Sequence, residues 1–351
     1  VWALLGLYYV MPWINIGGKQ SVLFDLPARK FYILGFTFWP QDFVYLALLL
    51  ITAGLSLFFF TALAGWLWCG YACPQTVWTE TFIWIERLIE GDRAKRMKLD
   101  KAPWSAEKVM RKTGKQAAWI LFAAWTGFTF VGFFSPIREL GSAVVSLSLG
   151  PWETFWIIFY SVATYGNAGF LREQVCKYMC PYARFQSAMF DKDTLIISYD
   201  EGRGEPRGGR RKKDDKDQLG LGDCINCTLC VQVCPTGIDI RDGLQYECIA
   251  CAACIDVCDQ VMDKMGYDRG LVRYTTEHAL KHKEAHVVRP RILVYATLLF
   301  VLISGTLWAM TNRVPLRADM IRDRNALYRE LPGDMIENVY TLKITNMDTA
   351  T

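Results

Sequence analysis

The chain has 351 residues, which is long enough for two or three domains. Hydrophobic residues make up 52%, aromatic residues 14% and charged residues only 21%, a balance that is unusual for a single soluble domain. The formal net charge of +4 does not indicate a nucleic-acid partner, because most basic residues lie in loops that flank apolar stretches.

Five stretches of the chain contain no Asp, Glu, Lys, Arg or His. Each is close to or above the roughly 18–20 apolar residues that cross a bilayer as a helix. They are residues 1–18, 43–79, 116–137, 154–171 and 292–312. A buried core helix explains one such run, but five of them predict a mainly α membrane protein with about five transmembrane helices, four of them in residues 1–200.

The first run is not typical of a signal peptide, because it lacks a basic start and a small-residue cleavage site. We therefore expect a spanning helix there. Because the chain starts at Val1, inside this apolar run, we also expect it to lack its natural N-terminus.

The distribution of basic residues predicts the orientation of these helices. Ten basic residues lie between positions 87 and 115, and more lie between 172 and 213, whereas the loops at 19–42 and 136–153 are poorer in Lys and Arg. By the positive-inside rule, the basic loops face the cytoplasm of a bacterial inner membrane. The N-terminus is then cytoplasmic, and the segment after residue 312 is periplasmic.

Eight cysteines repeat one spacing twice, Cys-x-x-Cys-x-x-Cys-x-x-x-Cys. This is the bacterial two-cluster ferredoxin run, in which three thiolates ligate one cluster and the fourth ligates the other. We therefore assign one [4Fe–4S] cluster to Cys224, Cys227, Cys230 and Cys258, and a second to Cys248, Cys251, Cys254 and Cys234. Pro235 fits the ferredoxin run, whereas Asp259 does not repeat it. Zinc or a disulfide framework is the alternative, but zinc ribbons use paired Cys-x-x-Cys units.

The domains follow from these motifs. A glycine-rich, charged stretch at 201–217 is typical of a solvated linker, and the ferredoxin module is expected at 218–270. A polar helix and the fifth transmembrane helix should occupy 271–312. Residues 338–346 alternate apolar and polar side chains, which predicts a β-strand and the start of a β-domain within 313–351.

Four further cysteines form two copies of Cys-x-x-x-Cys-Pro, Cys69 with Cys73 and Cys176 with Cys180. The i, i+4 spacing places both thiols of a pair on one helix face, and the following proline is expected to end that helix. Both pairs are predicted at the cytoplasmic boundary of the membrane, where a disulfide is disfavoured. We expect the four thiolates to form one soft-metal site, for which Cu(I) and a further iron–sulfur cluster are both open.

The chain has three histidines, His278, His282 and His286, spaced so that a helix would align them on one face. They could bind a transition metal, although a solvated polar face is the plainer interpretation. No predicted transmembrane run contains a histidine, which argues against a bis-His membrane haem.

Taken together, the chain resembles the FixG/RdxA family of cytochrome c oxidase accessory proteins, also called the CcoG family. The resemblance rests on five segments: 69–78 (CGYACPQTVW), 84–93 (WIERLIEGDR), 172–186 (REQVCKYMCPYARFQ), 234–246 (CPTGIDIRDGLQY) and 258–267 (CDQVMDKMGY). It implies a multi-pass membrane protein with an inserted cytoplasmic 2[4Fe–4S] ferredoxin module and a periplasmic immunoglobulin-like domain.

The resemblance also implies a function, the reduction of Cu(II) to Cu(I) for assembly of a cbb-type cytochrome c oxidase. The reacting thiols would be Cys69, Cys73, Cys176 and Cys180, and the partners would be the oxidase, its copper-delivery factors and a cytoplasmic electron donor. Two alternatives stay open: an electron-transfer subunit acting on quinone or a periplasmic reductase, and a non-enzymatic assembly scaffold. The sequence also leaves the oligomeric state open, a homo-oligomer included.

Overall fold

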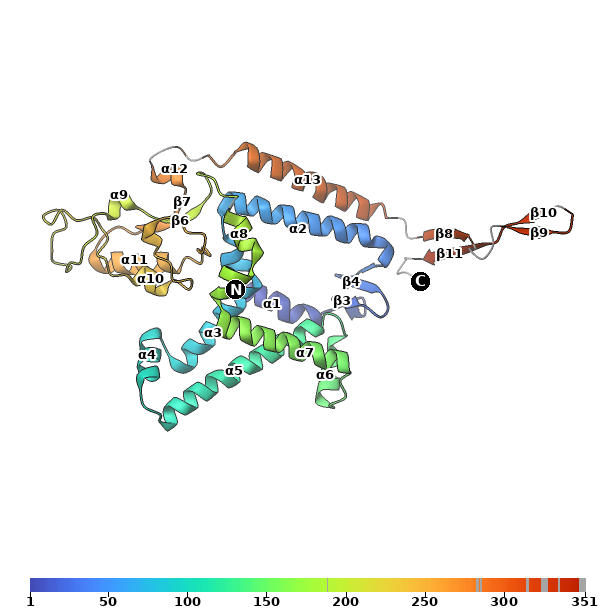
Figure 1. Ribbon diagram of the computed structural model, residues 1–351, viewed down its shortest axis with the longest axis horizontal. Coiled ribbons are helices and arrows are strands. Elements are labelled where there is room, and N and C mark those ends of the chain that lie inside the picture. Colours follow the sequence, from blue (N-terminus) through green and yellow to red (C-terminus); the bar gives the residue numbers. More distant parts are fainter. Residues whose placement is uncertain are drawn as a thin grey trace.

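The computed structural model describes residues 1–187, 189–281, 284, 286–313, 316–322, 328–333 and 335–346. Figure 1 shows an elongated molecule with long helices in the middle. A module of short elements lies at one end, and two β-hairpins lie at the other.

Two helices, α2 (Phe43–Ala64) and α13 (Pro290–Thr311), are long and apolar enough to cross a membrane. They lie side by side (Figure 1), and the Tyr45 hydroxyl donates to the Ala309 carbonyl at 3.0 Å. Almost none of their most apolar residues is buried inside the protein. Such continuous exposed apolar surface is typical of a lipid-facing helix.

A second helical group lies beside this pair. Helix α5 packs against α7 and α3, and the indole of Trp119 on α5 donates to the Phe82 carbonyl of α3 at 3.1 Å. The helices of this group are α1 (Trp2–Val10), α3 (Pro74–Glu90), α4 (Arg93–Lys101), α5 (Ala106–Val131), α6 (Ile137–Val145) and α7 (Pro151–Thr164). Helix α7 continues directly into the π-helical segment η4 (Tyr165–Leu171).

Two of the five apolar runs differ from the predicted helices. Run 1–18 forms the nine-residue α1, the 3₁₀ turn η1 (Met11–Trp13) and the short strand β1 (Asn15–Ile16). At about 1.5 Å per residue, nine residues span about 14 Å, less than half of a bilayer core. Run 43–79 is interrupted, because α2 stops at Ala64 and Gly65 takes a positive φ of 56° that glycine adopts without strain. The multi-pass topology and its orientation therefore remain predictions.

A small antiparallel sheet lies near the start of α2. Strands β3 (Val22–Asp25), β4 (Lys30–Ile33) and β5 (Phe36–Phe38) pair in sequence order, and β1 (Asn15–Ile16) pairs with β2 (Lys19–Gln20). The amide of Phe24 donates to the Phe133 carbonyl at 2.7 Å, which ties the sheet to the end of α5. The 3₁₀ turn η2 (Pro40–Asp42) then leads into α2.

The C-terminal strand prediction is confirmed and extended. Residues 338–346 contain β11 (Tyr340–Asn346), which pairs antiparallel with β8 (Leu316–Arg322). Strands β9 (Arg329–Leu331) and β10 (Met335–Glu337) form a second hairpin. Among the described residues of this segment, the predicted strand is therefore one of four, and it has a partner.

The cysteine-rich module starts before residue 218. Strand β6 (Ile196–Tyr199) pairs antiparallel with β7 (Val272–Thr275), so the two ends of the module are joined by one small sheet. Between them lie α9 (Glu201–Gly204), α10 (Leu229–Val233), η6 (Ile240–Asp242) and α11 (Ala253–Met265).

The start of the predicted linker at 201–217 is mostly exposed, as expected, but Arg203 and the buried Gly204 pack on this module. Arg203 forms an ion pair with Asp223 at 2.5 Å and donates to the Arg269 carbonyl at 3.0 Å. This packing follows from the pairing of β6 with β7. Because β6 ends at Tyr199 next to the other end of the module, the residues that follow it already lie against the module.

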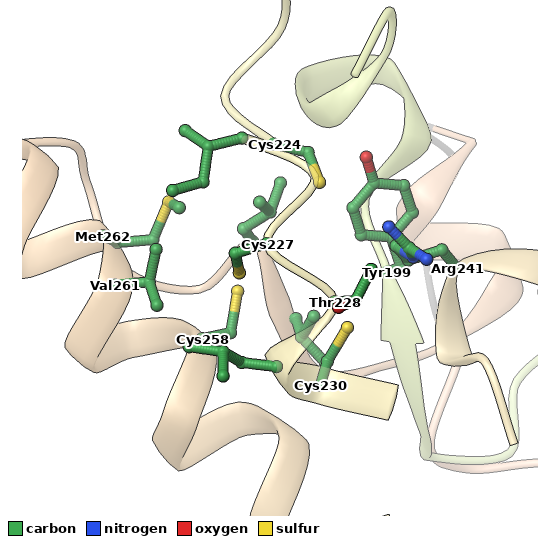
Figure 2. A pocket seen from close by; sticks show the side chains of 13 residues that line it. Tyr199, Cys224, Cys227, Thr228, Cys230, Arg241, Cys258, Val261 and Met262 are labelled. Atoms are coloured by element: carbon green, nitrogen blue, oxygen red, sulfur yellow. The ribbon is translucent and has the colours of Figure 1, made fainter. Parts of the chain in front are cut away.

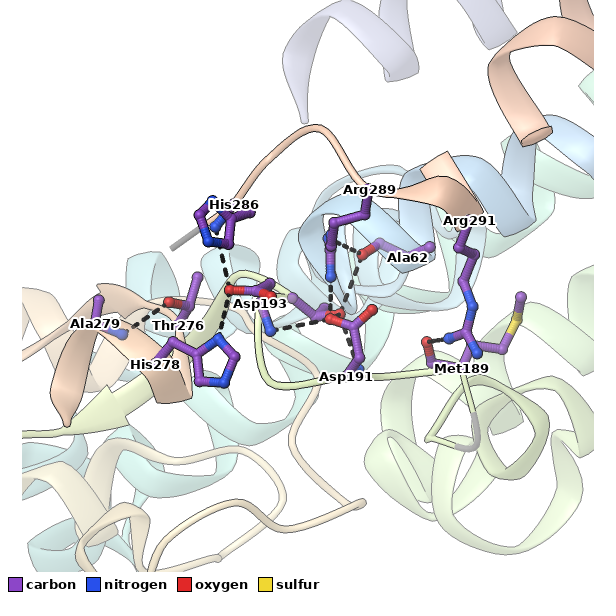
Figure 3. A network of polar contacts seen from close by, with 11 residues as sticks. Ala62, Met189, Asp191, Asp193, Thr276, His278, Ala279, His286, Arg289 and Arg291 are labelled. Carbon is purple, nitrogen blue, oxygen red and sulfur yellow. Dashed lines mark hydrogen bonds and ion pairs between the residues drawn. The ribbon is translucent and has the colours of Figure 1, made fainter. Parts of the chain in front are cut away.

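The predicted polar helix after the module is wrong, because α12 (Glu277–Leu280) spans only four residues. Figure 3 shows instead a polar network around Asp193, whose carboxylate lies 2.8 Å from Nδ1 of His278 and accepts the backbone N–H of His286 at 3.2 Å. Arg289 pairs with Asp191 and donates to the Ala62 carbonyl at 3.0 Å. His282 lies outside the described residues, and the other two histidines do not share a helix face.

Candidate functional site

The first predicted ligand set lies around one cavity (Figure 2). Cys224, Cys227 and Cys230 come from the loop before α10 and from its first turn, and Cys258 comes from α11. Burial raises the pKa of Cys258 to about 12, and charge on the other three thiols adds to the rise. Apolar side chains complete the cavity: Val261, Met262, Leu271 and Val272.

The second predicted set lines a second cavity. It comprises Cys234, Cys248, Cys251 and Cys254, with Cys230 also in contact. Burial raises the pKa of Cys254 to about 12, with charge on Cys248, Cys251 and Cys234 as the next causes. The structure thus exchanges the fourth cysteine of each run between the two cavities, as the ferredoxin spacing requires.

The two ligand loops share one unusual backbone conformation. Asn226 and Thr228, on either side of Cys227, have positive φ angles of 53° and 57°. Ala250 and Ala252, on either side of Cys251, repeat this with 53° and 62°. Side chains other than glycine rarely adopt such angles, and strain of this kind collects at functional sites. Here it curls each loop around its central cysteine, so that three thiols face one cavity.

The arrangement fits a cluster better than a single ion. Among the described residues, which include all twelve cysteines, no three His, Cys, Asp or Glu side chains are close enough to hold one metal ion. A tetrahedral zinc site needs four ligands around one centre, whereas a [4Fe–4S] cube takes each thiolate on a different iron. Bound clusters would store and release single electrons, and the mostly apolar lining of the two cavities would limit their contact with water.

The two Cys-x-x-x-Cys-Pro motifs have the same local fold. The first cysteine of each lies in a π-helical turn, η3 (Trp68–Ala72) or η5 (Val175–Met179). The second cysteine donates its N–H five residues back, from Cys73 to Trp68 at 2.8 Å and from Cys180 to Val175 at 2.9 Å. Such π turns often occur at functional sites.

The helical segment that carries the first cysteine ends just before the Cys-Pro pair, as predicted, and the proline also begins the next helix. Pro74 starts α3, and Pro181 starts α8 (Pro181–Ser187). Proline suits a first helical position because its missing N–H has no partner there in any case. The two thiols of a pair therefore lie at a junction between two helical segments.

The four thiols of the two motifs lie within electrostatic reach of one another, although no three of them are close enough to hold one metal ion as the structure stands. A thiolate charge at Cys69 interacts with Cys73, Cys176 and Cys180. Burial, followed by charge on Cys73, Cys180 and Glu173, raises the pKa of Cys176 to about 11. Because the four cysteines come from two distant parts of the chain, their proximity defines a site, which we call the four-thiol site.

A buried glutamine joins the two motifs at this site. The Cys69 thiol donates to Oε1 of Gln186 at 3.2 Å, and Nε2 of Gln186 donates to the Gly65 carbonyl at 3.1 Å. Gln186 follows the second motif on α8 and is fully buried. A buried amide with both ends bonded fixes its neighbours in place.

The first motif touches the second cluster loop. A Cβ built on Gly70 would lie 2.8 Å from the carbonyl oxygens of Ile249 and Ala250, so only glycine permits this approach. Next to it, the hydroxyls of Tyr71 and Tyr274 are 2.8 Å apart, and Tyr274 donates to the Ala250 carbonyl at 2.9 Å. The loop that carries Cys248 and Cys251 therefore lies directly on the turn that carries Cys69.

A cavity of about 430 Å³ lies beside this contact. Both Cys176 of the four-thiol site and Cys251 of the second cluster line it, together with the carboxylates of Glu80 and Glu173. Its size is in the range of small-molecule sites. Its lining carries three acidic residues, Glu80, Glu173 and Asp256, against Arg87 and Arg172, and Arg172 is paired with Glu86, so the balance of charge favours a cation.

A buried ionic network supports the second motif. Arg172, four residues before Cys176, has a positive φ of 45° and pairs with Glu86 of α3 at 3.1 Å. Lys115 of α5 pairs with Glu90 at 3.0 Å. Sequence reasoning assigned no role to these residues, nor to Gly70 and Gln186. The available signal was two glutamates four residues apart on one face of an otherwise apolar helix.

Known families match both the cysteine-rich module and the C-terminal hairpins. A family model described as a 4Fe-4S dicluster domain matches residues 171–277, and one described as an Ig-like fold at the C-terminus of FixG matches residues 306–351. The chain is 40% identical to the nitrogen fixation protein FixG of Rhizobium meliloti (strain 1021), over 98% of this chain and 72% of that protein. The chain belongs to the FixG/RdxA family.

Two further members of the FixG/RdxA family come from Cereibacter sphaeroides. Protein RdxB is 41% identical over 97% of this chain and 74% of its own length, and protein RdxA is 40% identical over 98% and 75%. No solved structure matches the chain. The predicted family is therefore confirmed, and the chain is an iron–sulfur redox protein. The two apolar helices indicate that it is a membrane protein.

Proposed function

We propose that this FixG/RdxA-family protein passes electrons from its two [4Fe–4S] clusters to Cu(II) at the four-thiol site. No three of the four thiols are close enough to hold one ion as the structure stands, so Cys69, Cys73, Cys176 and Cys180 would draw together around the copper. The single observation that carries the proposal is the contact of Gly70 with Ile249 and Ala250. It joins an iron–sulfur ligand loop directly to a second thiol site, an arrangement that a purely structural cysteine pair does not require.

The chemistry needs one electron for each copper ion. Clusters held by the eight cysteines of the module would supply one electron to each Cu(II), which would become Cu(I), and no covalent bond would be formed or broken in the protein. Soft thiolate ligands favour Cu(I), so Cys69, Cys73, Cys176 and Cys180 stabilise the product more than the substrate. The residues of the chain need supply no acid or base for this step.

The cavity beside Cys176 and Cys251 offers a way in for the metal. Glu80 and Glu173 would attract a hydrated cation there, because carboxylates raise the local concentration of cations. A Cu(II) ion in this cavity would lie between the donor cluster and the thiols that retain the product.

The biological role follows from the family and stays part of the proposal. Cu(I) would be supplied for assembly of a cbb-type cytochrome c oxidase and passed to its copper-delivery factors. The protein would sit in the bacterial inner membrane with the ferredoxin module in the cytoplasm, since the basic residues at 87–115 and 207–213 favour that side.

Metal analysis of purified, oxygen-free protein tests the assignment. We expect about eight irons in two clusters and one tightly bound Cu(I) per chain after copper addition. The double variant Cys73→Ser, Cys180→Ser should keep the irons and lose the copper. A matched control is Met179→Leu, an exposed position inside the second motif that should keep both.

Other outcomes assign other functions. If the double variant loses additional iron and not copper, the four-thiol site holds a further cluster. If a quinone, and not Cu(II), reoxidises the clusters, the protein is an electron-transfer subunit. If neither does so, the clusters are structural and the protein is a scaffold.

A further inference from the structure

The two cluster sites differ in their exposure. The second site lies on the Gly70 turn, toward the membrane helices. In the first site, Cys227 is exposed, whereas each of the other eleven cysteines is buried or half-buried. The first cluster would therefore come nearest to solvent at Cys227.

A dense basic run lies next to this exposed edge. Residues 207–213 contain five basic residues and no acidic ones: Arg207, Arg210, Arg211, Lys212 and Lys213. Over the longer stretch 207–217, six basic residues outnumber three acidic ones. Arg207 approaches Glu205 at 3.6 Å, but in the described part of the chain no carboxylate lies within ion-pair distance of the other four.

The run is attached directly to the first cluster loop. The Gly208 amide donates to the carbonyl of the ligand Cys224 at 3.2 Å. The Arg210 guanidinium lies 5.1 Å from the ring of Tyr267, and its Nε donates to the Tyr267 hydroxyl at 3.0 Å. These contacts hold Gly208 and Arg210 beside Cys224, so the run is anchored to the first site, and Arg211, Lys212 and Lys213 follow this anchor directly as exposed residues.

We infer that this basic surface, defined by residues 207–213 together with Cys227, docks the electron donor. The donor would be a small acidic protein with a flavin or iron–sulfur centre that carries one electron at a time. Its reduced centre loses one electron, the first cluster gains that electron, and no atom is transferred. The proposal rests on the proposed function for the direction of electron flow, from the first cluster through the second to the four-thiol site.

Charge complementarity favours an acidic protein, because opposite potentials steer partners together and raise association rates by about 10- to 1,000-fold. A basic run can also bind anionic lipid head groups. Figure 1 argues against that use, because the loops after α9 form the end of the module farthest from α2 and α13.

The test uses full-length protein in lipid nanodiscs, with clusters loaded and oxygen absent. The probe is a reduced acidic flavodoxin-type carrier, mixed rapidly with wild type and with the triple variant Arg211→Glu, Lys212→Glu, Lys213→Glu. We expect the second-order rate of cluster reduction to fall at least about tenfold at low salt, and its salt dependence to vanish.

Two controls separate docking from damage. Photoreduced deazaflavin, a small uncharged reductant, should reduce both proteins equally. The variant Lys95→Glu, Lys98→Glu, Lys101→Glu makes the same charge change on the exposed residues of α4 and should react with the carrier at the wild-type rate.

Equal carrier rates for wild type and the 211–213 variant would overturn the inference. It would also be overturned if that variant lost only its binding to anionic vesicles, because the run would then be a lipid contact. Copper reduction after deazaflavin treatment is unaffected by either result, so failure of the inference is distinguishable from failure of the proposed function.

Discussion

Gly70 and Ala250 lie so close together that a Cβ on Gly70 would stand 2.8 Å from the Ala250 carbonyl oxygen. The first residue lies between two thiols of the four-thiol site, and the second lies between two ligands of the second cluster. A contact at backbone distance between two redox-type sites leaves little insulating protein between them, which is the geometry that electron transfer needs.

The first prediction is that Gly70→Ala slows copper reduction without removing the clusters. The added methyl group meets two backbone carbonyls, so the loop and the turn must separate, at a cost of about 1–3 kcal/mol to their contact. Reoxidation of the reduced clusters by Cu(II) should therefore be slower than in wild type, with unchanged iron content.

The control is Gly166→Ala in the π-helical segment η4, where a Cβ has nothing within 4 Å. It should react as wild type does. Equal rates for Gly70→Ala and Gly166→Ala would show that electrons do not cross at this contact.

The second prediction concerns the exchange of the fourth cysteines. Cys227 and Cys258 face the same cavity, so replacing both by serine should remove one cluster and about four irons. Replacing Cys227 and Cys234 should remove both clusters, because Cys234 lines the other cavity. Iron analysis and EPR of the two double variants measure how many clusters each variant retains. The reverse pattern would mean that each run of four cysteines binds its own cluster.

The third prediction concerns the buried ionic network. The side chain of Glu90 is only 1% exposed and forms ion pairs with Lys112 and Lys115. Glu90→Gln removes the negative charge from both pairs. We expect the free energy of unfolding to fall by about 3 kcal/mol, the lower end for breaking a buried pair, because Lys115 keeps Glu86 at 3.5 Å.

Glu107→Gln is the matched control for that change. It breaks the exposed Arg111–Glu107 pair on α5 and should cost no more than about 0.5 kcal/mol. The free energies of unfolding of the two variants and of wild type are measured by denaturant unfolding in the same detergent. Equal losses would show that the network does not stabilise the α3–α5 packing.

The fourth prediction concerns orientation. Reporter fusions at Gly91 and after Lys213 should both report the cytoplasm, because basic residues flank both positions. A periplasmic signal at either position would separate the module from a cytoplasmic electron donor and would contradict the predicted topology.

Cysteine spacing predicted much of the candidate site. Ligand spacing limits which thiols can face one cluster, so the amino-acid sequence alone was enough to propose the two sets. The repeated Cys-x-x-x-Cys-Pro likewise predicted a meeting of Cys69 with Cys176. The approach of Gly70 to Ala250 could not be predicted. The sequence alone does not distinguish a glycine that packs against a distant backbone segment from a glycine with open space around its Cα.

Apolar runs were a weaker guide to the helices. Hydropathy does not register a positive φ, so the stop of α2 before Gly65 was missed. The end of a helical segment just before Pro74 was expected, but the start of α3 at this proline was not. The polar stretch after β7 has helix-forming residues, yet two of its described residues, His286 and Arg289, are held by Asp193 and Asp191. Such tertiary contacts override local preference.

Rapid-freeze EPR of oxygen-free, reduced protein mixed with one equivalent of Cu(II) tests the central claim most directly. In wild type, the Cu(II) signal and the reduced-cluster signal should disappear together. In the variant Cys73→Ser, Cys180→Ser, both signals should persist side by side while the iron content is unchanged. If that variant instead reduces Cu(II) at the wild-type rate, copper receives its electron away from the four-thiol site, and the account is contradicted.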